Sequence, residues 1–459
     1  MFIGRTQELR QLEEAYRAGH STACVLYGRY GIGKTELALT FAKEKPVVYY
    51  AARELSEREQ CLCFSGEWPE VFEDTLQVLS LYDIIKQLLT GKSGQKTVII
   101  LDEFQYLVEA GPMLSEALTK LLQEENCMIL LLSSSVNWIE NGMVEDMREA
   151  LRNITGIIKC REFSFVDMVK RCPKLTVEQT IMTYAVLGGV PGYLDYWDEA
   201  LDIKENLLKL MFRPEGVLFA EAETFLKKEL RELGSYNAIL TSLALGNNKL
   251  NDIYARTGFS RAKISVYIKN LIELDVVEKV FSFDSQEKAF QAHINAQKGL
   301  YRIKDRYLRF WYRYVFPHLS EICSGRGEAV LDRILAEDFP VYMRECFADV
   351  CEEYLHLMAK HNRLTAEYTT WGSWYGKTGR IDIVAGDGKG HTLAGFCRFD
   401  HIEMSLEELK EYLELTELAR LAPTEIFLFS RGGFTEEVKQ KKRTLEQGCR
   451  LVLIGLEDL

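Results

Sequence analysis

The stretch TACVLYGRYGIGKTELAL, residues 22–39, predicts a strand, a glycine-rich loop and a helix. An apolar run leads into the pattern G-x-x-x-x-G-K-T, from Gly28 to Thr35, and a run of helix-forming residues follows. A strand, a glycine-rich loop and a helix in that order cradle phosphate groups, because the N–H groups of the loop and the helix dipole point at the anion. The alternative is a strand-to-helix turn that contains Lys-Thr by chance, and the pattern of both flanks argues against it.

The residue types in this loop predict their roles. Lys34 is expected to reach the β- and γ-phosphates of a nucleotide, and the hydroxyl of Thr35 is expected to bind Mg²⁺. The sequence therefore predicts a nucleotide site at the start of the helix. Its predicted contacts are Gly28, Arg29, Tyr30, Gly31, Ile32, Gly33, Lys34, Thr35 and Glu36.

A second apolar run, KTVIILDE at residues 96–103, ends in two carboxylates. It reads as a buried parallel strand whose functional groups lie at its carboxyl end. Asp102 is then placed to hold Mg²⁺, and Glu103 to orient or deprotonate the attacking water, so Glu103 and Lys34 are the predicted catalytic residues. A core strand that ends in two solvated acids is the alternative, and the loop upstream makes it the weaker one.

Composition narrows the class of protein. The chain has 459 residues, of which 47% are hydrophobic and 27% charged, as in ordinary globular proteins with several domains. Its net charge of −12 argues against a protein that coats nucleic acid with its whole surface, although a local basic face remains compatible. The apolar runs are too short to span a bilayer, and the charged N-terminus lacks a signal-peptide core, so we expect a cytoplasmic protein without a membrane partner.

Five segments occur in an order that resembles the archaeal-type ATPase family, a P-loop group related to AAA+ and STAND ATPases. They are FIGRTQELRQLEEAY, GRYGIGKT, ILDEFQYL, LLSSSV and LGGVPGYL, and they lie within residues 2–194. The resemblance implies ATP as the nucleotide, with the adenine near Phe2, Ile3 and Arg5. It also implies a helical lid that begins near Pro191, and a sensor of the γ-phosphate at Ser133 or Ser135. Similar proteins often carry a Gly-Arg pair after the third strand; this chain reads ALRNITG there, so no arginine finger is assigned.

Residues 235–304 show three helical patterns followed by two candidate strands, which together predict a winged helix-turn-helix. The third helix is expected to begin at Ser260 and to present Arg261, Lys263 and Lys269, with Arg302 and Lys304 added by the strands. Such a basic patch suits the phosphate backbone of duplex DNA. A lid or an autoinhibitory cover over the ATPase part is the alternative role of this module.

The C-terminal third resembles the restriction-endonuclease-like domain found in this family, on the segments GRIDIVAGD and FLFSRGGFT. In active nucleases of that fold, one acid and an acid-x-Lys triplet bind Mg²⁺ and activate water. Asp382 matches the first acid, but Phe396 and Arg398 stand where the second acid and the lysine belong. Phenylalanine cannot ligate a metal and arginine cannot act as a base, so we expect a degenerate centre. An acid recruited from elsewhere would restore it.

The predicted fold class is therefore α/β: a P-loop, AAA-like ATPase with a helical lid, a winged helix and an α/β restriction-endonuclease-like domain. The first hypothesis for its function is a magnesium-dependent ATPase whose nucleotide state controls the other modules. The second is a slow switch that stays bound to ATP or ADP and recognises duplex DNA or a protein, and a homo-oligomer fits either. The expected domains are residues 1–180 (ATPase core), 181–230 (lid), 231–305 (winged helix), 306–330 (connecting helix) and 331–459 (nuclease-like).

Overall fold

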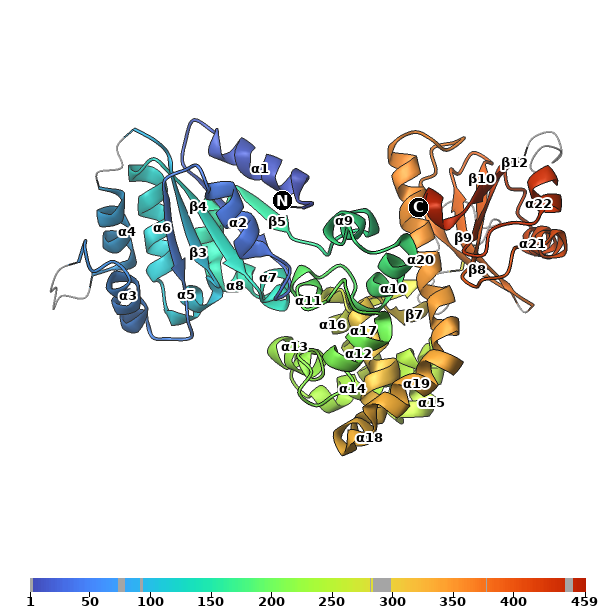
Figure 1. The fold of residues 1–459 in the computed structure, drawn as a ribbon. Coiled ribbons are helices and arrows are strands. Elements are labelled where there is room, and N and C mark those ends of the chain that lie inside the picture. Colours follow the sequence, from blue (N-terminus) through green and yellow to red (C-terminus); the bar gives the residue numbers. More distant parts are fainter. Residues whose placement is uncertain are drawn as a thin grey trace. The chain divides into compact units, whose positions relative to one another are not determined.

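The computed structural model describes residues 3–72, 79–90, 94–280, 282–283, 299–376, 378–441 and 449–459 (Figure 1). The chain forms two compact units. The first comprises Met1–Phe163, Val190–Asp195 and Phe225–Arg231. The second comprises Ser164–Gly189, Tyr196–Thr224 and Glu232–Leu459.

The first unit is built on a five-stranded sheet in the order β2-β3-β4-β1-β5, and all of its strands are parallel. Helices cover a parallel sheet on both faces, which explains why every residue of the three central strands is buried. The strands are β1 (Thr22–Tyr27), β2 (Val47–Ala51), β3 (Thr97–Asp102), β4 (Cys127–Ser133) and β5 (Gly156–Lys159). The helices are α1 (Thr6–Tyr16), α2 (Lys34–Ala42), α3 (Glu57–Gly66), α4 (Leu81–Leu89), α5 (Gln105–Ala110), α6 (Met113–Glu124), α7 (Val136–Asn141), α8 (Met143–Met147) and η1 (Arg148–Asn153).

The strand order brings the predicted site together. β1 lies next to β4, and β4 lies next to β3, with Tyr27 opposite Ser133 and Leu101 opposite Leu131. The carboxyl ends of the three strands therefore meet at one edge of the sheet. The glycine-rich loop, the two acids and the serine run all follow directly from that edge.

The second unit begins with helices that precede the predicted winged helix. They are α9 (Phe165–Arg171), α10 (Val177–Leu187), α12 (Ile203–Leu210) and the start of α13 (Glu221–Glu229), while α11 (Pro191–Leu194) belongs to the first unit. Three further helices and two antiparallel strands follow in the expected order: α14 (Leu233–Ala244), α15 (Leu250–Thr257), α16 (Arg261–Glu273), β6 (Val277–Val280) and β7 (Leu300–Ile303). The Ser260 side chain caps α16, as predicted, and Gly258 ends α15 with φ 70°.

The expected connecting helix over residues 306–330 is not one continuous helix. The chain forms α17 (Arg306–Phe310), then short turns η3 (Trp311–Val315), η4 (Phe316–His318), α18 (Leu319–Glu321) and η5 (Ile322–Arg326). The helical stretch that follows is interrupted as well, between α19 (Gly327–Glu337) and α20 (Phe339–Lys360). Pro340 explains this break, because proline lacks the N–H that a continuous helix needs and its ring crowds the preceding turn. Five aromatic residues of this region are buried: Tyr307, Phe310, Trp311, Tyr312 and Tyr314.

A second five-stranded sheet lies at the C-terminal end of the chain, in the order β12-β11-β10-β9-β8. Its strands are β8 (Thr370–Tyr375), β9 (Arg380–Gly386), β10 (Thr392–Arg398), β11 (Glu425–Ser430) and β12 (Arg450–Ile454). β8, β9 and β10 are antiparallel neighbours, whereas β10, β11 and β12 run parallel. A capping box of Ser405 and Glu408 opens α21 (Leu406–Leu418), and α22 (Glu436–Lys441) and η6 (Leu456–Asp458) follow. Within the described ranges, no helix is long and apolar enough to cross a membrane.

Candidate nucleotide-binding site

The glycines of the loop after β1 have conformations that other residues adopt poorly. Gly28, Gly31 and Gly33 have φ angles of 155°, 77° and 87°. A side chain at Gly28 would also bring its Cβ to 2.6 Å from the carbonyl oxygen of Cys160. Both the dihedral angles and the close packing therefore explain why the sequence has glycine at these positions.

Lys34 begins α2, and its side chain folds back over the loop. Lys34 is only 5% exposed, and its Nζ donates to the carbonyl oxygens of Gly28 and Arg29 at 2.8 and 3.1 Å. A third bond, of 3.0 Å, reaches Ser134 Oγ. Burial lowers the pKa of the Lys34 ammonium, while the charges of Asp102 and Glu103 act in the opposite direction. The ammonium thus lies where loop, strand end and acids meet.

Thr35 and Asp102 are in direct contact. The hydroxyl of Thr35 donates to Oδ2 of Asp102 at 2.6 Å, and the hydroxyl of Tyr49 donates to the same oxygen at 3.1 Å. The backbone N–H of Glu103 donates to Oδ1 at 3.0 Å. A carboxylate and a hydroxyl are oxygen ligands of the kind Mg²⁺ prefers, and Mg²⁺ usually keeps several waters besides, so these residues fit that ion. Tyr49 is a contact that the sequence motifs do not indicate, because it comes from β2.

Glu103 is held by three donors. The backbone N–H of Ser134 donates to Oε2 at 3.0 Å, Nε2 of Gln105 donates to the same oxygen at 2.7 Å, and the Ser134 hydroxyl donates to Oε1. Glu103 also has φ 52°, in the left-handed region that is uncommon for residues with a side chain. Its carboxylate is thereby fixed between the ends of β3 and β4.

The serine that lies against both Lys34 and Glu103 is Ser134, which is flanked by the two predicted sensors. Ser133 is fully buried and donates to Oε1 of Gln105 at 2.7 Å, and the N–H of Ser135 donates to Ser133 Oγ at 3.2 Å. Ser134 lies just beyond the last residue of β4, where its hydroxyl is bonded to both Lys34 and Glu103. The sensor role of Ser133 or Ser135 remains a prediction, and Ser134 is a further candidate.

The N-terminal segment supports the loop from outside. Nη2 of Arg5 donates to the carbonyl oxygen of Ile32 at 2.8 Å, and its guanidinium lies 5.4 Å from the ring centre of Phe163. Ile3 is half-buried and Phe2 lies outside the described residues, so the expected adenine contacts stay a prediction. At the far end of the loop, Glu36 is exposed.

Comparison with known proteins agrees with this geometry. Residues 2–196 match a family described as an ATPase domain predominantly from Archaea. The N-terminal part of the chain is an archaeal ATPase domain. Residues 311–410 match a second family, described as Archaea bacterial proteins of unknown function. An uncharacterized protein of Methanocaldococcus jannaschii is 27% identical over 394 residues, which are 84% of this chain and 84% of that protein.

Two of the solved structures that are similar to this chain have low sequence identity and TM-scores below 0.5. A Walker-type ATPase of Pyrococcus abyssi has a TM-score of 0.48 and 18% identity, over 68% of this chain and 96% of that chain. The ORC2 protein of Aeropyrum pernix, in its ADPNP–ADP complexes, has a TM-score of 0.44 and 16% identity, over 72% of this chain and 95% of that chain. Both superpositions are loose, so the assignment of the archaeal ATPase domain rests on the family match and on the residues around the loop.

Beyond the archaeal ATPase domain, α16 presents two of its three predicted DNA contacts to solvent. Arg261 and Lys269 are exposed, and Lys263 is half-buried with Nζ 4.4 Å from the ring centre of Phe259. Nε of Arg261 donates to Asn251 at 3.0 Å, and Lys269 lies 3.5 Å from Glu273. Nothing in these contacts prevents Arg261 or Lys269 from facing a phosphate.

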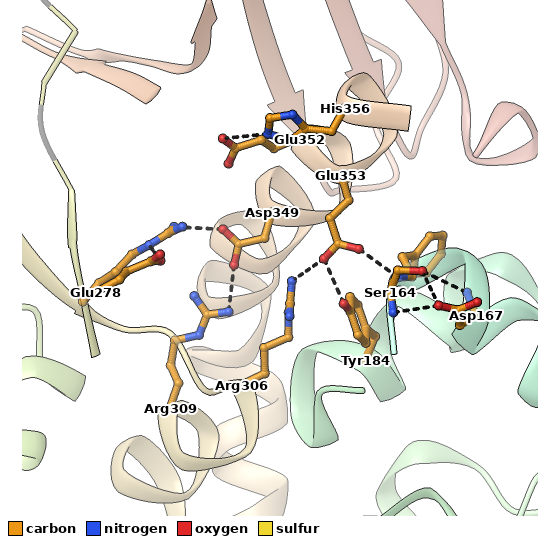
Figure 2. A network of polar contacts seen from close by, with 12 residues as sticks. Ser164, Asp167, Tyr184, Glu278, Arg306, Arg309, Asp349, Glu352, Glu353 and His356 are labelled. Carbon is orange, nitrogen blue, oxygen red and sulfur yellow. Dashed lines mark hydrogen bonds and ion pairs between the residues drawn. The ribbon is translucent and has the colours of Figure 1, made fainter. Parts of the chain in front are cut away.

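Arg302 is placed differently from its expected role at a DNA surface. Its Nη1 lies 2.8 Å from Oδ1 of Asp349, and it also contacts Glu278 over 2.5 Å; Figure 2 labels these two acids. Nη2 of Arg309 lies 2.9 Å from the second oxygen of Asp349. Burial would raise the pKa of Asp349, but the positive charges of Arg302 and Arg309 outweigh it and hold the pKa below its usual value. Arg302 is therefore paired with two carboxylates, although its side chain stays 38% exposed.

The residues of the predicted nuclease centre are also engaged internally. Asp382 accepts from Nε of Arg380 at 2.6 Å and from the N–H of Cys397 at 2.9 Å. Phe396 is buried and stacks on Tyr412 with ring centres 4.3 Å apart. Arg398 contacts Asp400 and Glu408. Among the described residues, no three His, Cys, Asp or Glu side chains form a group that could hold a metal ion.

Proposed function

We propose that this protein is a magnesium-dependent ATPase. The contact of 2.6 Å between Thr35 and Asp102 is the observation that carries the proposal, because it joins the two halves of the site at the residues expected to hold the metal ion. Lys34 and Glu103 are linked to each other through the hydroxyl of Ser134, to which both are bonded. A structural turn has no need to bring a lysine, a hydroxyl and two acids together at one sheet edge.

In this proposal each residue has a defined task. Lys34 binds the β- and γ-phosphates, and Thr35 and Asp102 hold Mg²⁺, which when bound neutralises phosphate charge and polarises the phosphoryl group. Glu103 accepts a proton from the attacking water. To do so its carboxylate must exchange at least one bond from Ser134 or Gln105 for a bond to that water.

The nucleotide state is proposed to act on the modules that follow: a helical lid, a winged helix and a nuclease-like domain that does not cleave DNA. The buried stacking of Phe396 and the pairing of Asp382 with Arg380 support the last point, because neither side chain is presented as a metal ligand. Duplex DNA is the proposed partner of α16, through the exposed Arg261 and Lys269.

A slow switch is the second candidate function, and the bonding of Glu103 favours it. The Glu103 carboxylate already accepts three hydrogen bonds, which compete with a bond to the attacking water. ATP hydrolysis is then slow until a partner changes the surroundings of Glu103. Such a protein would bind ATP or ADP tightly and hydrolyse ATP at a low rate.

Steady-state ATP hydrolysis with Mg²⁺ separates these candidates. The variants are Lys34→Ala and Glu103→Gln, with Lys43→Ala as the control, since Lys43 is an exposed lysine that directly follows α2. Turnover that both site variants lose and the control keeps supports the ATPase, and stimulation by duplex DNA supports the DNA partner. Tight binding of ATP or ADP without turnover supports the switch, whereas nucleotide binding that survives Lys34→Ala contradicts both.

A further inference from the structure

Residues Phe225–Arg231, at the end of α13, cluster with the first unit although their chain neighbours on both sides belong to the second. We call them the 225–231 segment. Its contacts are made with two places around the nucleotide site: the variable positions of the glycine-rich loop, and the turn that follows β4.

The loop positions contacted by the 225–231 segment are those that phosphate binding does not explain. The pattern G-x-x-x-x-G-K-T leaves the residues at Arg29 and Tyr30 open, yet both are large here. The guanidinium of Arg29 lies 4.3 Å from the ring centre of Phe225, and Nζ of Lys228 lies 4.6 Å from that of Tyr30. Each is a cation–π contact of the kind that joins two segments.

Glu229 lies at the second place. Its Oε2 accepts the backbone N–H of Asn137 at 3.2 Å, at the start of α7. That start is two residues beyond Ser134, whose N–H and hydroxyl hold Glu103 and whose oxygen accepts from Lys34. Burial raises the pKa of the Glu229 carboxylate, while the Asn137 N–H and the charge of Lys34 act in the opposite direction. It is thus an extra acid beside the proposed position of the γ-phosphate.

Resting on the proposed function, we propose that Glu229 determines nucleotide specificity: it lowers the affinity for ATP relative to ADP. The γ-phosphate adds negative charge between Lys34 and Glu103, and in a partly buried site that charge is weakly screened from Glu229. ADP lacks this group and leaves Glu229 undisturbed. By the reciprocity of linked equilibria, ATP then weakens the attachment of the 225–231 segment to the loop, and ADP preserves it.

Nucleotide affinities test this inference. Isothermal titration calorimetry with Mg²⁺ compares ADP with the slowly hydrolysed analogue adenylyl imidodiphosphate, on the wild type and Glu229→Gln. The amide keeps an oxygen to accept from Asn137 and removes the charge. Glu44→Gln is the control, because it removes the same charge from an exposed position on the first unit.

We expect Glu229→Gln to tighten binding of the triphosphate analogue about 5- to 10-fold, to change ADP binding less than about 2-fold, and to exceed the control. Equal changes for both nucleotides, or no change, overturn the inference and leave the proposed function standing. A wild type that binds neither nucleotide overturns both.

Limited trypsin digestion gives a second readout that does not depend on the variant. Lys228 and Arg231 are cleavage sites within the 225–231 segment. In the wild type, cleavage there should be faster with the triphosphate analogue than with ADP, because a detached segment is more accessible. Equal cleavage with the two nucleotides contradicts the inference even when both bind.

Discussion

Thr35 and Asp102 lie 67 positions apart in the sequence, yet the hydroxyl of one donates to the carboxylate of the other over 2.6 Å. The first residue of this pair follows β1 and the second ends β3, with β4 between the two strands. The pair is therefore formed by the sheet as a whole. The proposed metal ion would also bind at this pair. A substitution of Thr35 therefore tests the site directly.

Thr35→Val keeps the shape of the side chain and removes the oxygen. We expect ATP hydrolysis to fall about 100-fold or more, because a metal ligand and its charge stabilisation are lost together. Thr35→Ser keeps the hydroxyl and should stay within a few-fold of the wild type. Thr40→Val, on the same helix, controls for helix stability. A steady-state phosphate-release assay measures all three, and equal loss in the serine and valine variants would contradict the role of the hydroxyl.

Ser134→Ala removes the hydroxyl that links Lys34 to Glu103. We expect kcat to fall about 10-fold or more with a smaller change in KM, because an oriented hydrogen bond near the reacting groups is lost. Ser135→Ala is the matched control, one residue further along. If Ser135→Ala lowers kcat and Ser134→Ala leaves it unchanged, the sensor is Ser135, which is one of the two residues that the sequence predicts.

Thr35 and Ser134 show what the sequence can and cannot predict about the site. The partnership of Thr35 with Asp102 follows from the motifs, since parallel strands bring their carboxyl ends to one edge. The choice among three consecutive serines depends on where β4 ends, because Ser133 is its last residue while Ser134 and Ser135 lie between β4 and α7. Tyr49 lies on β2, whose position beside β3 no local motif indicates.

Outside the first unit, the sequence predicts a helix boundary correctly but does not predict which distant residues form ion pairs. The predicted helix start at Ser260 is present in the structure, because a helix cap depends on neighbouring residues alone. Arg302 is expected at a basic surface, and the structure pairs it with Asp349 at 2.8 Å while leaving its side chain 38% exposed. A pattern of charges along the chain does not show which of them will form ion pairs with distant residues.

Asp349→Ala tests this buried network. Loss of the carboxylate leaves Arg302 and Arg309 without their shared counter-ion, and breaking a buried ion pair in this way costs about 3–5 kcal/mol. Urea denaturation of the full chain measures the change. Glu352→Ala is the control, one turn away on α20, where its contact with His356 spans 3.8 Å at the surface (Figure 2). Its cost should stay below about 0.5 kcal/mol, and similar losses in both variants would show that the network contributes nothing particular.

The same residue predicts a dependence of stability on pH. Burial opposes ionisation of Asp349, but Arg302 and Arg309 hold its pKa below the value of about 3.9 expected in the unfolded chain. A carboxylate with a depressed pKa contributes stability that is fully present above the unfolded pKa and is lost as pH falls through the folded pKa. The free energy of unfolding of the wild type should therefore decrease from about pH 5 downward, and Asp349→Asn should lack this component. Denaturation at pH 7, 5, 4 and 3 measures both proteins; a stability difference that stays constant across this series would mean that Asp349 is not held ionised by the two arginines.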